Sequence, residues 1–156
     1  MAIFRRKSAA AEAGPPLDTD GEWALGEGEI NGRPLIARWD VEAKRNCPDR
    51  SRPVKVTVGV QCAETRPDGL PAGQDLELLE AMEQAMFDEL PSLAGSQPVL
   101  VVTNNGMREW IIYASSHEWL ESWAPGFRTR FMRGRPGKID AVRDADWQTF
   151  KEWTTP

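Results

Sequence analysis

Residues 54–62 constrain the fold more than any other stretch, because apolar and polar side chains alternate there without a break. Apolar groups stand at every second position, at Val54, Val56, Val58, Val60 and Cys62. Side chains of a β-strand point alternately to its two faces, so this period places all five on one face. The opposite face carries Lys55, Thr57, Gly59 and Gln61. We therefore predict a strand with one face in a core.

Two β-hairpins are predicted, one before this strand in the chain and one after it. The first joins residues 23–30 to 33–39 through Asn31-Gly32. The second joins residues 98–103 to 107–115 through Asn104-Asn105-Gly106. An Asn-Gly pair favours a type I′ turn, since both central residues of that turn require a positive φ.

Other segments show helical spacing or turn chemistry. Helical spacing relates Leu76, Leu79, Met82 or Glu83, Met86 and Leu90, and it predicts a helix that Pro91 ends. Ser115 and Glu118 have the spacing of a capping box and predict a short helix that stops at Pro125-Gly126. Residues 127–133 alternate and predict a last strand, residues 144–153 predict a closing helix, and the charged residues 40–52 predict a loop.

These elements together predict an α+β fold. From residue 53 onward the expected order is strand, helix, strand, strand, helix, strand, which is the ferredoxin-like βαββαβ topology of an antiparallel sheet. The first β-hairpin precedes this unit and the C-terminal helix follows it. A chain of 156 residues suits one domain. We expect a disordered tail over residues 1–21 and a single domain over residues 22–156.

Charge and cysteine content narrow the expected partners and compartment. The net charge of −5 repels phosphate backbones, so nucleic acid is not an expected partner. Two cysteines, Cys47 and Cys62, give no disulfide framework and fit the reducing cytoplasm. With one histidine they form no zinc pattern, so we expect neither metal nor cofactor. No apolar run reaches the roughly 18 residues of a membrane span.

Three stretches of the chain stand out by their sequence and spacing: Glu22-Trp23 with Asn31 to Leu35, then Pro67-Asp68-Gly69-Leu70-Pro71, and Thr103 to Trp110. Together they resemble a bacterial family, the domain of unknown function 695. The resemblance covers residues 22–153. It implies no catalytic residues, because the activity of that family is not established. It also implies a link to regulators of the RNase E inhibitor type, which act by binding another protein.

The predicted topology gathers polar side chains at one end of the sheet. The loop after residue 62, the Asn105-Gly106 turn and the turn at residues 124–127 would all lie there. We expect a site for a small anionic ligand or a partner loop, formed by Arg66, Asp68, Asn104, Asn105, Arg108, Glu109 and Trp123. The alternative is that these side chains only shape turns and pair with neighbouring charges.

Three functions stay open at this point. The first is a non-catalytic binding or regulatory module acting through a protein partner or a small ligand. The second is an enzyme of unrecognised class that uses Asp68, Arg108 and Glu109 at the loop end. The third is single-stranded RNA binding on an open sheet face lined by Lys55, Thr57, Gln61, Tyr113, Arg128 and Arg130. Tryptophans near the ends of elements also leave a homodimer open.

Overall fold

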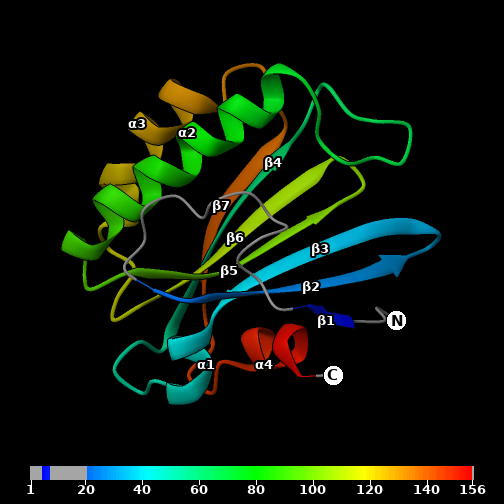
Figure 1. The fold of residues 1–156 in the computed structure, drawn as a ribbon. Coiled ribbons are helices and arrows are strands. Elements are labelled where there is room, and N and C mark those ends of the chain that lie inside the picture. The colour runs from blue at the N-terminus through cyan, green and yellow to red at the C-terminus, as the bar shows by residue number, and fades with distance from the viewer. Residues whose placement is uncertain (1–4, 8–20, 156) are drawn as a thin grey trace.

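The computed structural model shown in Figure 1 describes residues 5–7 and 21–155 of the chain. Its strands are β1 (Arg5–Lys7), β2 (Trp23–Ile30), β3 (Arg33–Asp40), β4 (Val54–Gln61), β5 (Gln97–Asn104), β6 (Met107–Ala114) and β7 (Gly137–Arg143). Its helices are α1 (Val41–Asn46), α2 (Gln74–Glu89), α3 (Leu120–Phe131) and α4 (Gln148–Thr154), and a short 3-10 helix, η1 (Leu90–Ser92), follows α2.

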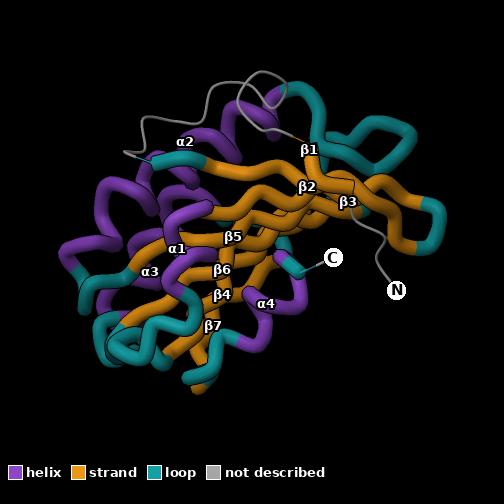
Figure 2. Tube along the Cα trace, turned by 60° about the horizontal axis from the view of Figure 1, so that its bottom comes forward, coloured by secondary structure: helices purple, strands orange, loops and turns teal. Residues whose placement is uncertain are grey.

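The seven described strands form one antiparallel sheet. Its order is β1-β2-β3-β5-β6-β4-β7, as Figure 2 shows. Helices α2 and α3 lie together on one side of the sheet, whereas α1 and α4 lie on the other (Figure 1). The predicted α+β fold is confirmed. The order of the whole sheet differs from that of a bare ferredoxin-like layer, because β1, β2 and β3 are added beyond β5.

Both predicted hairpins are confirmed, and their turns have the expected backbone. Asn31 and Gly32 have φ values of 51° and 78° between β2 and β3. Asn105 and Gly106 have φ values of 47° and 79° between β5 and β6. These left-handed conformations match the two central positions of a type I′ turn.

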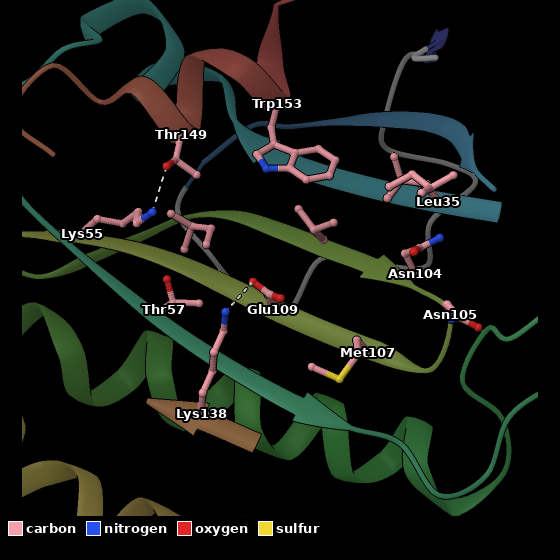
Figure 3. Close-up of a pocket in the computed structure, with 13 residues that line it drawn as sticks. Leu35, Lys55, Thr57, Asn104, Asn105, Met107, Glu109, Lys138, Thr149 and Trp153 are labelled. Carbon is pink, nitrogen blue, oxygen red and sulfur yellow. Dashed lines mark hydrogen bonds and ion pairs between the residues drawn. The ribbon is translucent and has the colours of Figure 1, made fainter. Parts of the chain in front are cut away.

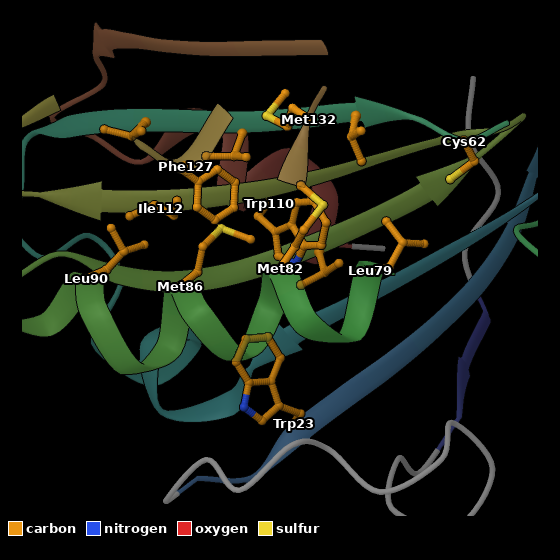
Figure 4. Close-up of a cluster of buried hydrophobic side chains, with 14 of the residues drawn as sticks. Trp23, Cys62, Leu79, Met82, Met86, Leu90, Trp110, Ile112, Phe127 and Met132 are labelled. Carbon is orange, nitrogen blue, oxygen red and sulfur yellow. The ribbon is translucent and has the colours of Figure 1, made fainter. Parts of the chain in front are cut away.

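The main core lies between the sheet and the helices α2 and α3 (Figure 4). The even-numbered valines of β4 face it, as predicted, and Val56 and Val58 are fully buried. Helix α2 faces these valines with a stripe of apolar side chains, at Leu79, Met82 and Met86. Burying one such side chain fully contributes roughly 1.5–3 kcal/mol.

A second, smaller core lies on the opposite side of the sheet. The ring of Tyr113 on β6 stacks on Trp147 with 4.0 Å between their centroids, and Phe150 of α4 packs edge-on against Trp147. Trp39 of β3 belongs to the same cluster. The cluster covers one end of this face and leaves the other end open, where the candidate site lies.

The predicted strand over residues 127–133 is wrong, and so is the helix stop at Pro125. Helix α3 runs through Pro125 to Phe131, and the strand follows later, as β7. The ring of Phe127 is fully buried in the main core and stacks on Trp123, 4.5 Å away. This packing outweighs the backbone hydrogen bond that a proline removes from a helix.

Two local predictions near helix starts are also wrong. Helix α3 begins at Leu120 after an N-cap residue, Trp119, that makes no side-chain cap, while the hydroxyl of Ser115 donates instead to the carbonyl of Ala94. Residues 40–52, expected as a loop, contain α1. The Asp40 carboxylate caps α1 by accepting from the N–H groups of Glu42 and Ala43, which is a standard N-cap that the prediction overlooked.

Two further predictions concern the N-terminal tail and membrane-spanning segments. The tail expected over residues 1–21 lies outside them, except for β1 and Gly21. Within the described part of the chain, every helix is too short or too polar to cross a bilayer.

Candidate functional site

A pocket of about 380 Å³ opens on the α4 side of the sheet, beyond the second core (Figure 3). We call it the open-face pocket. Its apolar lining consists of Ile30, Leu35, Val102, Met107, Ile111 and Trp153. Its polar lining consists of Lys55, Thr57, Asn104, Asn105, Glu109, Lys138 and Thr149. Strands β3 to β7 supply the floor, and α4 supplies Trp153 and Thr149 as a wall.

Strand register explains why these residues meet. Val102 of β5 lies opposite Glu109 of β6, Glu109 lies opposite Gly59 of β4, and Gly59 lies opposite Lys138 of β7. Paired residues on neighbouring strands point to the same face, so this row crosses the pocket floor. Gly59 has no side chain and so leaves space between Glu109 and Lys138. A Cβ at this position would lie only 3.3 Å from Cγ of Glu109 and 3.4 Å from Cγ of Lys138.

The pocket holds more positive charge than its own acidic group neutralises. Lys55 Nζ donates to Thr149 Oγ1 at 2.9 Å. Lys138 Nζ lies 3.8 Å from Oε2 of Glu109, which is an ion pair but too long for a hydrogen bond. Two ammonium groups therefore face one carboxylate. Each ammonium carries three donors, so most of this donor capacity is unused within the described chain.

One hydroxyl in the pocket is also without a partner. Thr57 is only 4% exposed, yet its Oγ1 makes no hydrogen bond to any residue that the structure describes. Thr57 lies on β4 between Lys55 and Gly59, on the same face as both. A hydroxyl and two ammonium groups beside an apolar floor can hold an anionic group at one side and an apolar body at the other.

A second pocket of about 530 Å³ lies at the loop end of the sheet, beside the β5–β6 turn. It is lined by Arg33, Gln61, Cys62, Thr65, Arg66, Pro67, Gly69, Asn105 and Gly106. Both of its cations are engaged, since Arg33 donates to the Pro67 carbonyl at 2.9 Å and Arg66 pairs with Asp68 at 3.0 Å. Burial, with the nearby Asp75 carboxylate, raises the pKa of the Cys62 thiol, which disfavours the reactive thiolate.

The residues predicted to form one site are distributed over four places. Asn104 and Glu109 line the open-face pocket, Asn105 lines both pockets, and Arg66 lines the loop-end pocket with Asp68 beside it. Trp123 lies on α3, packed against Trp119 and Phe127. Arg108 lies under α2. The loop end therefore brings together Arg66, Asp68 and Asn105.

Arg108 and Glu109 point to opposite faces, because successive residues of a strand do so. Glu109 faces the open-face pocket, whereas Arg108 donates to Thr103 Oγ1 at 2.8 Å on the α2 side. Burial, and then repulsion from Arg38, lowers the pKa of Arg108 to about 10, so its guanidinium stays charged at neutral pH. The two side chains cannot act on the same reacting group.

The residues considered for RNA binding are also separated. Lys55 and Thr57 do line the open face. Tyr113 is fully buried under Trp147, where its hydroxyl donates to Asp144 at 2.8 Å, so it cannot stack a base. Arg128 and Arg130 belong to α3 on the opposite side of the sheet.

Sequence reasoning overlooked several residues that line the open-face pocket. Lys138 lies beyond the last strand predicted from the sequence, and Thr149 and Trp153 lie in the predicted closing helix, to which no site role was given. The alternation of Lys138, Asp140 and Val142 with Ile139 and Ala141 was the available signal for β7. Within residues 5–7 and 21–155, no group of three or more acidic, cysteine or histidine side chains is placed to hold a metal ion.

Comparison with known proteins agrees with the resemblance described above. No curated protein and no solved structure matches this chain. The family of unknown function DUF695 matches residues 21–154, and so covers both pockets and all four helices named above. The chain therefore belongs to the DUF695 family of unknown function.

Proposed function

We propose that this protein is a non-catalytic binding module whose open-face pocket receives a small molecule with a carboxylate and an apolar body. The observation that carries the proposal is the division of the pocket lining. Lys55, Lys138 and the unpartnered hydroxyl of Thr57 lie on the β4–β7 side. Leu35 and Val102 lie on the β3–β5 side.

The charge of the lining supports an anionic ligand. Lys55 and Lys138 together outweigh Glu109 by one positive charge. The long distance between Lys138 and Glu109 leaves the ammonium free to bind a second carboxylate. Such charge-assisted hydrogen bonds are roughly twice as strong as neutral ones, so the carboxylate would contribute substantially to affinity.

The size and composition of the pocket support a small organic molecule. Its volume of about 380 Å³ lies at the lower end of the roughly 300–1,000 Å³ typical of ligand pockets. The indole of Trp153 extends from α4 over the sheet, toward the side where Leu35 lies (Figure 3). A flat apolar body would fit between this indole and the floor, where it would bury aromatic and aliphatic surface.

The proposed role also includes a scaffold for the pocket and a location in the cell. The order β5-β6-β4-β7, with α2 and α3 as the two crossover helices, supports a ferredoxin-like unit to which β1, β2 and β3 are added. Such a unit would act as a rigid scaffold that couples an occupied pocket to a regulatory partner. Cytoplasmic location is part of the same proposal, and the two free cysteines support it.

Calorimetric titration with phenylacetate and with the uncharged phenylacetamide tests the proposal. We expect saturable binding of phenylacetate at one site and at least about tenfold weaker binding of the amide, since the amide lacks the anion. Lys55→Met keeps the aliphatic stem and removes the ammonium, so it should weaken phenylacetate binding by a similar factor. Lys151→Met on α4 is the matched control, because Lys151 lies outside the pocket lining.

Two results would reject the carboxylate ligand. Equal affinity for phenylacetate and phenylacetamide would show that the cations take no part in binding. Loss of affinity in Lys151→Met to the same extent as in Lys55→Met would show a general charge effect rather than a site.

A further inference from the structure

The outer edge of β7 is an unpaired edge of the sheet among the described strands. β7 is the last strand of the sheet and pairs only with β4 among the described strands. Five of its seven residues are exposed. Val142 on this strand is 49% exposed, and Leu76 is the other large apolar side chain with such exposure in the described residues.

The backbone groups at this edge follow from the hydrogen bonds at the two ends of the β4–β7 pairing. The N–H of Gln61 donates to the Pro136 carbonyl, and the N–H of Asp144 donates to the Pro53 carbonyl, each at 2.9 Å. Hydrogen-bonded pairs alternate along antiparallel strands, so the even-numbered residues of β7 bond to β4. The odd-numbered residues therefore direct their N–H and C=O groups outward, at Gly137, Ile139, Ala141 and Arg143.

Charge along the edge selects which strand can pair there. Lys138 and Asp140 lie on the same face of β7, two residues apart. Charged side chains on an edge discourage pairing with unrelated strands. A strand that runs antiparallel and carries the same two charges in the same order can instead place Asp140 against Lys138, and Lys138 against Asp140.

One register satisfies the hydrogen bonds and the charges together. When two β7 strands pair about Ile139, the outward-facing residues Ile139 and Ile139 become a hydrogen-bonded pair. Lys138 of each copy then faces Asp140 of the other in a non-hydrogen-bonded pair, where Cα atoms are about 4.5 Å apart and side chains are closest. Beyond the Gly137–Ala141 pair, the next pair on the same face joins Val142 to Pro136, so the exposed valine also gains an apolar neighbour.

Neighbouring registers lack this complementarity. Pairing about Asp140 sets two Asp140 carboxylates against each other, which is destabilising. Pairing about Ala141 sets Asp140 against Val142, and it sets Lys138 against Asp144, whose carboxylate already accepts from Tyr113 and from the N–H groups at the start of α4. Among the residues of β7 itself, opposite charges therefore face each other in one register only.

We propose that two copies of the chain form a dimer by antiparallel pairing of their β7 edges about Ile139. The two seven-stranded sheets then continue as one, and the open-face pockets lie on the same side of it, near the two-fold axis. The dimer uses the same Lys138 side chain as the ligand proposal, but its test is made without ligand, so either proposal can fail alone. The ladder is short, so we expect a concentration-dependent dimer rather than a permanent one.

Sedimentation equilibrium of the full chain, from micromolar to millimolar concentration, tests the dimer. Wild type should show reversible dimerisation. Asp140→Lys and Lys138→Asp should each raise the dissociation constant about tenfold or more, because two attractive pairs become repulsive. An equimolar mixture of these two variants should form a heterodimer, and the double variant that exchanges both charges should dimerise like wild type.

A backbone variant provides a second readout that does not depend on charge. Ala141→Pro removes one outward N–H and leaves the bonds to β4 intact, so it should also weaken the dimer while thermal unfolding shows a folded monomer. The proposal is overturned if wild type stays monomeric at millimolar concentration. It is also overturned if Asp140→Lys dimerises like wild type, or if mixing the two charge variants fails to restore association.

Discussion

The ammonium of Lys138 lies 3.8 Å from the carboxylate of Glu109, across the bare backbone of Gly59. The half-exposed side chain of Lys138 gains little from an ion pair at this distance in water. The pair therefore leaves Lys138 able to exchange Glu109 for the carboxylate of a ligand.

Gly59→Val should close the open-face pocket while the sheet stays intact. A Cβ at position 59 would lie 3.3 Å from Cγ of Glu109 and 3.4 Å from Cγ of Lys138, and valine adds two methyl groups beyond it. We expect phenylacetate affinity to fall about tenfold or more, and the free energy of unfolding to change by less than about 1 kcal/mol, because valine favours strands. Calorimetry and urea unfolding measure the two effects.

Gly21→Val is the matched control for this variant, because nothing lies within 4 Å of a Cβ at Gly21. Unchanged phenylacetate affinity in Gly59→Val would contradict the assignment of the ligand to the open-face pocket.

Glu83→Ala should be strongly destabilising. The buried Glu83 carboxylate accepts hydrogen bonds from Arg38 at 2.6 Å and from the indole N–H of Trp110 at 2.9 Å, and so links α2 to β3 and β6. Removing it leaves a cation and a buried donor without their acceptor, which costs about 3 kcal/mol. Glu80→Ala, on an exposed position of the same helix, should change the free energy of unfolding by less than about 0.5 kcal/mol. Equal effects of the two variants in urea unfolding would contradict this account.

Asp75 should make folding stability depend on pH in the acid range. Burial would raise the pKa of Asp75, but hydrogen bonds from Arg135 and from the N–H groups of Glu64 and Ala63 outweigh it and hold the pKa below its ordinary value. The unfolded chain therefore takes up the proton first. The stability from Asp75 is fully present above the ordinary carboxyl pKa and is lost as the pH falls through the folded-state pKa.

Urea unfolding measured from neutral to acid pH checks this dependence. Asp75→Asn should be less stable than wild type at neutral pH and should lose less stability on acidification. Asp88→Asn, on the exposed side of α2, is the control and should follow the wild-type curve. A wild-type slope that persists in Asp75→Asn would assign the dependence to other carboxylates.

Tyr113→Phe tests the contact that positions α4, the wall of the pocket. The Tyr113 hydroxyl donates to Asp144 at 2.8 Å, and Asp144 accepts from the N–H groups of Gln148 and Thr149 at the start of α4. Loss of the hydroxyl should cost about 1.5–3 kcal/mol in the free energy of unfolding, since a buried hydrogen bond to a charged acceptor is removed. Phenylacetate affinity should also fall, because α4 carries Thr149 and Trp153. An unchanged thermal midpoint would contradict the role given to this hydrogen bond.

The sequence predicted those elements whose signals are local. Strand β4 and the turns at Asn31-Gly32 and Asn105-Gly106 are each determined by a few neighbouring residues. The continuation of helix α3 beyond Pro125 was missed because its cause is distant. The ring of Phe127 is buried against residues far away in the chain, and this burial carries the helix through Pro125.

The candidate site depended on strand register, which sequence periodicity does not supply. Placing Lys138 opposite Gly59, and Gly59 opposite Glu109, requires the pairing of three strands that are far apart in the chain. A local signal did exist for the separation of Arg108 from Glu109. Arg108 and Glu109 are consecutive in a strand, so their opposite orientation could have been predicted and the shared catalytic site rejected.

Methyl-detected NMR during a phenylacetate titration tests the central claim most directly. The account predicts that the largest shift changes fall on the methyl groups of Leu35, Val102 and Ile111 in the open-face pocket. Methyl groups of the α2 side, such as Leu79 and Met86, should stay unchanged. Changes confined to the α2 side, or no changes at a saturating concentration of phenylacetate, would contradict it.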